Sequence, residues 1–157
     1  MSTYSPQVIA NTIIELSLHD EIKLTPMKLQ KIMYFAYKHY LQTTGESLFS
    51  ERFEKWKYGP VLPSIFYEFN DFKKESITRF ARDARGKVTT LNMERIESLA
   101  VQTVDYIWHK YRRYSAVLLS QLTHLPGSAW DKANTFLEDK DIFNEPEYTI
   151  RERTTSS

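Results

Sequence analysis

Cysteine is absent from the 157-residue chain, and glycine occurs only four times. Without cysteine there can be no disulfide, thiolate metal site or cysteine nucleophile. The four glycines are too scattered to form a phosphate-binding loop or a dinucleotide fingerprint. They are Gly45, Gly59, Gly86 and Gly127. These two shortages exclude several classes of enzyme and nucleotide-binding protein.

Long apolar runs are also missing. No segment approaches the roughly 20 apolar residues that span a bilayer. Residues 1–6 are polar and are not arranged as a basic region followed by an apolar one, which would indicate a secretory signal. We therefore expect no membrane association, and the cytoplasm is the expected location.

Catalytic and metal-binding motifs are not found either. The four histidines lie far apart in sequence, with no H-x-x-x-H or H-E-x-x-H spacing. No G-x-S-x-G elbow is present, and no carboxylate stands in a pattern that indicates a pKa-shifting pocket. We expect no catalytic residue, no metal and no cofactor, and hence a protein that is not an enzyme.

The net charge is only +1, but the basic residues concentrate in one segment. Residues 71–113 contain ten Lys or Arg and six Asp or Glu. A nucleic-acid-binding protein presents a basic face, so this segment is the candidate. Interleaved acidic residues favour a solvated face instead, and nucleic acid is disfavoured as a partner. Within residues 71–87, the acidic residues interleaved with the basic ones are Asp71, Glu75 and Asp83.

Helix signals dominate the chain. Ser5 and Thr25 each precede a proline, the pattern of an N-cap followed by proline in the first helical turn. We expect the first helix to stop near Asp20 and the second, densely apolar helix to end before Gly45. A third helix can begin at Pro63, after the Gly-Pro break.

The sequence pattern in the second half of the chain predicts further helices. Asn92 is the expected N-cap of a long helix that includes Ile96, and Ser115 should start a short one. The expected fold is mainly α: a single compact domain of about six helices, with a short strand or hairpin near 49–58 and 76–90. Residues 76–90 can equally be a loop. The expected division is a helical domain at 1–137 and an acidic-to-polar extension at 138–157, partly mobile.

Aromatic side chains cluster around Gly59-Pro60. Trp56 and Phe66 are expected in the core beside a turn, whereas Tyr58 is expected on an exposed bend that proline makes rigid. An aromatic residue held on a rigid bend loses little entropy on binding and suits an interface. The cluster thus gives a hypothesis of partner binding.

Two separated blocks of sequence then resemble one family. The first runs from Lys28-Leu29-Gln30-Lys31-Ile32-Met33-Tyr34-Phe35 to Trp56-Lys57-Tyr58-Gly59-Pro60-Val61, and the second covers Leu118 to His124 and Gly127 to Ala133. Together, over roughly residues 5–137, they are similar to the Panacea domain of SocA-like antitoxins and GepA-like mobile-element and prophage proteins. Lys55 and Ala129 depart from the family pattern, which commonly has a small residue and often a proline there.

The resemblance implies an antitoxin that neutralises a co-encoded toxin by direct protein–protein binding. Lys55 could then alter a surface that selects the partner. The partner-binding residues expected are Lys55, Trp56, Lys57, Tyr58, Gly59, Pro60 and Trp130. The alternatives are a prophage or mobile-element regulatory protein that does not neutralise a toxin, and a nucleic-acid-binding regulator. It is also possible that the chain forms a homo-oligomer, and the sequence does not decide this.

Overall fold

The computed structural model describes residues 3–147 of the chain. This part contains seven α-helices and a two-stranded hairpin, joined by loops. In chain order the elements are α1 (Pro6–Asp20), α2 (Pro26–Thr44), β1 (Glu54–Trp56), β2 (Gly59–Val61), α3 (Pro63–Phe69), the 3-10 turn η1 (Asn70–Phe72), α4 (Leu99–Tyr111), α5 (Ala116–Thr123), α6 (Ala129–Lys132) and α7 (Asp139–Phe143). The expected mainly α fold is confirmed.

The first two helices begin and end where the sequence predicts. The hydroxyl of Ser5 accepts a hydrogen bond from Gln7 N, and that of Thr25 accepts one from Lys28 N, so each satisfies a backbone donor in the first turn. Helix α2 ends at Gly45, whose φ of 76° is the left-handed conformation of a glycine cap.

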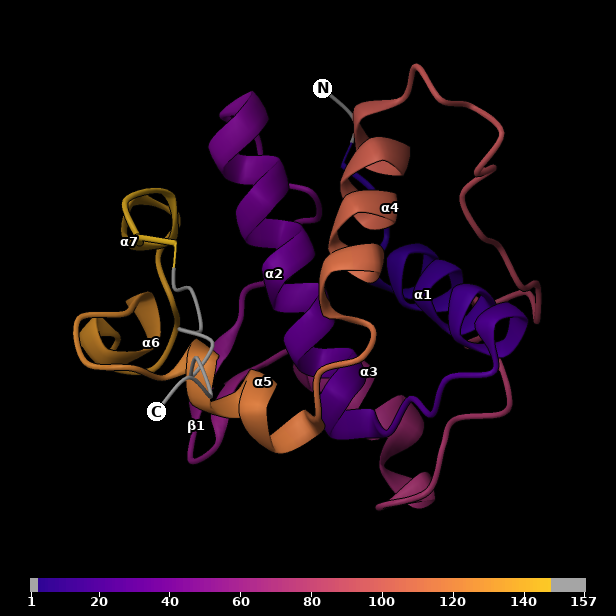
Figure 1. Ribbon diagram of the computed structural model, residues 1–157, viewed down its shortest axis with the longest axis horizontal. Coiled ribbons are helices and arrows are strands. Elements are labelled where there is room, and N and C mark those ends of the chain that lie inside the picture. Colours follow the sequence, from indigo (N-terminus) through magenta and orange to yellow (C-terminus); the bar gives the residue numbers. More distant parts are fainter. Residues whose placement is uncertain (1–2, 148–157) are drawn as a thin grey trace, which may run out of the picture.

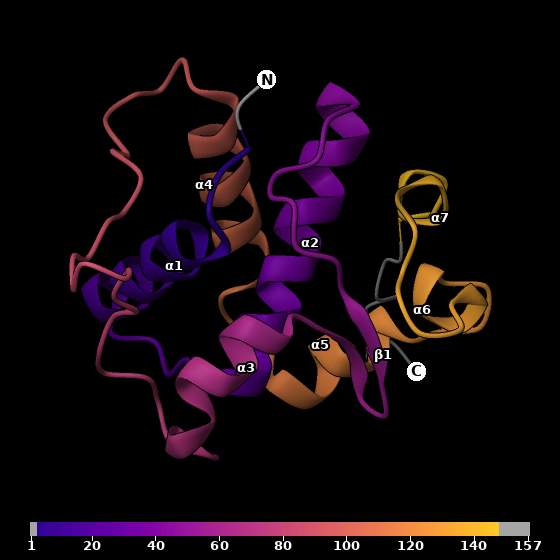
Figure 2. The same cartoon turned by 180° about the vertical axis from the view of Figure 1, so that it is seen from behind.

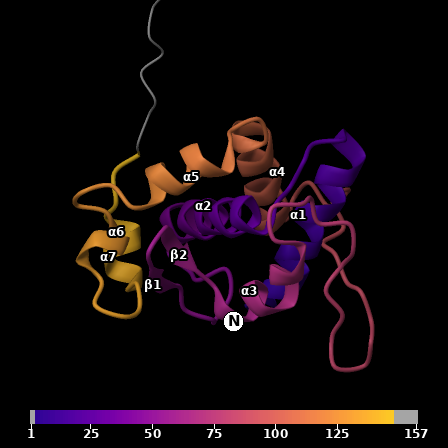
Figure 3. The same ribbon diagram turned by 90° about the horizontal axis from the view of Figure 1, so that it is seen from below.

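Helix α2 lies at the centre of the molecule (Figures 1 and 2). Seen from below, α4 and α5 lie on one side of α2 and the hairpin with α3 on the other (Figure 3). Thirteen of its 19 residues are buried, because a helix that is apolar on almost every side is stable only when surrounded. The other elements are therefore arranged around this helix.

Aromatic pairs join α2 to its neighbours. The rings of Phe35 and Tyr111 of α4 stack with their centroids 4.4 Å apart, and Tyr34 meets Phe53 edge-on at 5.2 Å. Trp108 of α4 is fully buried. Each such ring buries a large apolar area when it packs in a core.

The hairpin expected near 49–58 is present, slightly later in the chain. Strands β1 and β2 pair antiparallel, with Glu54 opposite Val61 and Trp56 opposite Gly59. No strand forms in residues 76–90, so the alternative of a loop holds there. Side chains of α1 supply part of the hydrogen bonding that a partner strand would otherwise give this loop.

Two residues of α1 hold the loop. The side chain of Asn11 donates to the carbonyls of Ala81 and Thr89 and accepts from Ala81 N at 2.8 Å. The hydroxyl of Thr12 accepts from Leu91 N at 2.9 Å. Because these backbone groups are satisfied by side chains, the loop needs no secondary structure of its own.

The expected N-cap at Asn92 is wrong. Helix α4 starts later, with Ser98 as the cap that accepts from Val101 N. Asn92 instead accepts a hydrogen bond from Glu94 N, an Asx-type turn that competes with a helix start. Ile96, expected on the helix, lies before it and is 77% exposed.

The segment after residue 137 packs against the helical body as far as Glu147. Helix α7 contacts α2 and α6, and Glu145 is buried. The division at 137 stays a prediction. The mobile end expected within 138–157 falls largely on residues 148–157, which lie outside the described residues.

Candidate functional site: a partner-binding groove

An apolar groove of about 560 Å³ lies between the start of α2, the hairpin and α3. Its apolar lining comes from Met27, Trp56, Tyr58, Val61 and Phe66. The charged groups that line it are Lys31, Lys57 and Lys73. Among the described residues that line the groove there is no carboxylate. The groove therefore combines an apolar floor with positive charge.

The aromatic side chains of the groove are more exposed than the sequence predicts. Trp56 and Phe66 are half-buried and meet edge-on at 4.8 Å, so their expected place in the core is wrong. Helix α3 has only seven residues and packs through Ile65 and Phe69, which turns Phe66 toward the hairpin. Tyr58, expected to be displayed, is 56% exposed.

The exposed bend is one position earlier than expected. The turn consists of Lys57 and Tyr58, whereas Gly59 and Pro60 form a buried strand. Gly59 has φ 117°, and a Cβ there would lie 2.6 Å from the hydroxyl oxygen of Thr123. Only glycine allows β2 to approach α5 this closely.

Beneath Gly59 lies Lys31, which the sequence analysis did not select. Its side chain is 1% exposed, and its amine donates a 2.9 Å hydrogen bond to the carbonyl of Pro60. Burial disfavours the charged amine and lowers the pKa of Lys31 to about 7. The available signal was a lysine within the most densely apolar stretch of the chain.

Lys55 of β1 and Trp130 of α6 connect the hairpin to α6, and neither lines the groove. The Lys55 amine donates to the carbonyls of Asp131 and Ala133 and lies 4.6 Å from the centre of the Trp130 ring. The Trp130 indole N–H donates a 2.7 Å hydrogen bond to the carbonyl of Trp56. Of the seven expected partner-binding residues, the structure therefore brings Trp56, Lys57 and Tyr58 together in the groove.

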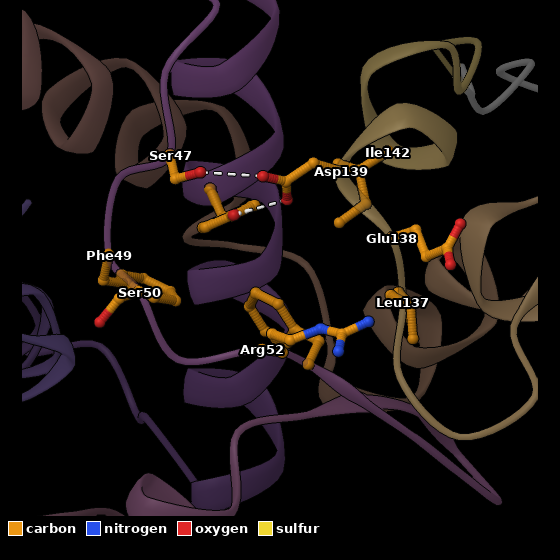
Figure 4. A pocket seen from close by; sticks show the side chains of 10 residues that line it. Ser47, Phe49, Ser50, Arg52, Leu137, Glu138, Asp139 and Ile142 are labelled. Atoms are coloured by element: carbon orange, nitrogen blue, oxygen red, sulfur yellow. Dashed lines mark hydrogen bonds between the residues drawn. The ribbon is translucent and has the colours of Figure 1, made fainter.

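A second cavity, of about 250 Å³, separates α2 from residues 137–142 (Figure 4). Ser47 and Asp139 point toward one another across it, joined at 2.8 Å, and the Tyr37 hydroxyl also donates to Asp139, at 2.6 Å. Burial, together with the bond to Asp139, raises the pKa of Tyr37. These contacts fasten α7 to α2.

Much of the basic segment 71–113 is an exposed loop with internal pairing, as expected for a solvated face. Arg79 forms an ion pair with Asp71 at 3.1 Å, and Asp83 accepts hydrogen bonds from the backbone of Arg85 and Lys87. The acidic residues thus engage the loop itself, as an interleaved charge pattern suggests.

Residues 3–147 contain neither a candidate metal site nor a helix suited to span a membrane. No group of three His, Asp or Glu residues in this range is placed to hold a metal ion. None of the helices in the same range is both long and apolar enough to cross a membrane.

The fold and the groove define a small helical domain that presents aromatic and basic side chains beside a rigid hairpin. The sequence model of the family described as "Antitoxin SocA-like, Panacea domain" matches residues 29–131, and the chain belongs to this family. The match includes the hairpin and most of α2 and of α6. The resemblance inferred from the sequence is confirmed, and membership of the family supports an antitoxin role.

A curated relative agrees with the family assignment. Antitoxin SocA of Caulobacter vibrioides (strain NA1000 / CB15N) is 25% identical over 127 residues, which cover 80% of this chain and 68% of the relative. No solved structure matches the chain.

Proposed function

We propose that this antitoxin neutralises a co-encoded toxin by binding it directly, and that the groove between α2, the hairpin and α3 receives the toxin. The observation that carries the proposal is the cluster of Trp56, Tyr58 and Phe66, partly exposed in a groove of about 560 Å³. Large aromatic side chains in well-packed pockets contribute most of the binding energy at protein interfaces.

The charge of the groove indicates what the toxin presents. Three lysines and no carboxylate line it among the described residues, so an acidic surface is electrostatically complementary. Because apolar contacts form the floor, the toxin segment should place an apolar side chain between its carboxylates. The proposed partner surface is therefore both apolar and acidic.

The hairpin is held in place before any partner binds. Trp130 bonds to the carbonyl of Trp56, Ser120 of α5 donates to the carbonyl of Tyr58, and Lys31 bonds to that of Pro60. A preorganised surface loses less entropy on association than a flexible one. The groove is thus suited to tight binding.

The test is co-expression with the product of the neighbouring toxin reading frame. We expect growth to be restored and the two proteins to co-purify. Lys57→Glu reverses a charge in the groove and should weaken the complex at least about tenfold. Lys87→Glu is the matched control, because Lys87 is exposed on the distant loop.

Three outcomes distinguish the proposed function from its alternatives. Persistent growth arrest with no complex contradicts the proposal. A complex that forms without relief of arrest supports a regulatory interaction protein instead. Equal loss of binding in the two charge reversals would show that overall charge, not the groove, determines the affinity.

A further inference from the structure

Resting on the proposed function, we propose that Lys31 pairs with a carboxylate of the toxin that enters the groove beside an apolar side chain. Lys31 lies under the hairpin and belongs to the lining of the groove. The occupant is thus a toxin segment in which an aspartate or glutamate is adjacent to a large apolar residue.

The Lys31 amine has no acidic partner among the described residues. A protonated lysine has three N–H donors. The hydrogen bond to Pro60 O uses one of them, and no carboxylate within residues 3–147 lies within ion-pair distance. A buried charge is normally paired, so the free protein holds this amine at a cost that an incoming carboxylate would relieve.

The elements around Lys31 provide little negative charge. Neither β2 nor α5 contains a charged residue. On β1, Glu54 accepts from the Trp56 indole, and Lys55 bonds to backbone near α6.

The remaining titratable groups nearby are mostly positive. Lys57, Tyr58 and Lys73 share the groove, and Lys28 precedes Lys31 on α2 by about one turn. Glu68 of α3 and Asp71 of η1, which pairs with Arg79, are the remaining carboxylates on the described elements that line the groove. The toxin must therefore supply the counter-ion.

This arrangement couples binding to a proton. The pKa of Lys31 is about 7 in the free protein, so at pH 8 most molecules have a neutral amine. A carboxylate within about 4 Å favours the charged form and raises the pKa. Binding at pH 8 should then take up one proton, and affinity should fall as the pH rises above about 7.

The experiment is calorimetry of the full-length chain with the product of the neighbouring toxin reading frame, at pH 8 in phosphate and in Tris. The two buffers differ in ionisation enthalpy, so the difference in binding heat gives the number of protons taken up. We expect about 0.9 proton per complex for the wild type, from a free pKa near 7. Lys31→Met, which keeps the apolar stem, should take up none and bind at least about tenfold more weakly.

Lys57→Gln is the matched control: it should weaken binding while proton uptake stays unchanged. Absence of uptake in the wild type overturns the assignment of Lys31 without any variant. So does a Lys31→Met protein that keeps both uptake and affinity. In both cases the complex still forms, so direct neutralisation stands; absence of any complex overturns both proposals.

Discussion

The hydroxyl of Tyr34 lies 3.1 Å from each carboxylate oxygen of Glu145, although 111 residues separate the two in sequence. The same carboxylate forms an ion pair with Lys38 at 3.0 Å and accepts a hydrogen bond from Ala129 N at 2.9 Å. Both charged side chains are almost completely buried. One carboxylate thus joins α2, the start of α6 and the end of the described chain.

Replacing Glu145 should strongly destabilise the fold. Glu145→Gln removes the charge beside Lys38, and breaking a buried ion pair costs about 3 kcal/mol or more. Urea unfolding monitored by circular dichroism measures the loss. Glu147→Gln is the control, since Glu147 is 65% exposed in its pair with Lys110 and should cost less than about 1 kcal/mol. Equal losses in the two variants would contradict the role of Glu145.

Gly59 should tolerate alanine much less than a glycine in open space. Both Gly59 and Gly86 have positive φ, but a Cβ on Gly86 meets nothing within 4 Å, whereas one on Gly59 meets Thr123. Gly59→Ala also places an L side chain at φ 117°, farther from the left-handed region than the 78° of Gly86, and the steric contact adds about 1–3 kcal/mol at Gly59 alone. Thermal unfolding compares them. Similar melting temperatures would show that β2 can move away from α5.

Asp20 should contribute to stability against acid. Hydrogen bonds from Trp108 first, and then the contacts with His19 and Arg112, hold the pKa of Asp20 at about 2, below its ordinary 3.8. A lowered pKa stabilises the folded state above pH 4, and this contribution is lost as the pH falls toward 2.

Chemical unfolding at pH 7, 5, 3 and 2 tests the assignment. The wild type should exceed Asp20→Asn in stability at pH 7 and 5, and the difference should shrink between pH 4 and 2. Asp71→Asn, at an exposed ion pair, should show a small difference at every pH. A difference for Asp20→Asn that does not change with pH would exclude the carboxylate as its source.

Lys31 should make stability rise with alkaline pH. Its pKa falls from 10.5 to about 7 on folding, so the unfolded chain binds more protons between these values. The free energy of unfolding of the wild type, relative to Lys31→Met, should be constant below pH 7. It should then increase by a few kcal/mol up to pH 9.5. Urea unfolding at pH 6, 8 and 9.5 measures this, with exposed Lys87→Met as control, which should show no trend.

Tyr58 should contribute more to toxin binding than Tyr67, which is also exposed. Tyr58 is 56% exposed and lines the groove, whereas Tyr67 is 69% exposed and does not line it. Alanine at Tyr58 should cost about 2 kcal/mol of binding energy, or roughly 30-fold in affinity, as at an aromatic hot spot. Titration with the toxin measures both variants. If Tyr67→Ala is the more damaging, the interface lies on another face of α3.

The local signals in the sequence predict much of the fold. Ser5, Thr25 and Ser115 cap helices as expected, because a cap depends on the residues of one turn and on little else. Asn92 fails by the same logic: its side chain satisfies a neighbouring backbone group, and the cap passes to Ser98. Sequence patterns do not show which of two suitable caps the tertiary contacts favour.

The candidate site could be predicted only in part. The aromatic cluster and the Gly-Pro pair lead to the hairpin, and Tyr58 is exposed as expected. The partial exposure of Trp56 and Phe66 could not be predicted, because it depends on how few contacts the short helix α3 makes with the body. The buried position of Lys31 could not be predicted either, because a lysine on an apolar helix can equally well extend into solvent.

By itself the sequence determined the mainly helical class, the ends of α1 and α2, the hairpin and the family, since each rests on neighbouring residues or on an ordered pattern of them. Only the tertiary structure decided which side chains form the groove. It places Lys31 of α2 under Gly59 of β2 and Thr123 of α5, three positions far apart in the sequence. Their proximity depends on packing around α2, and packing also sets the burial that lowers the pKa of Lys31.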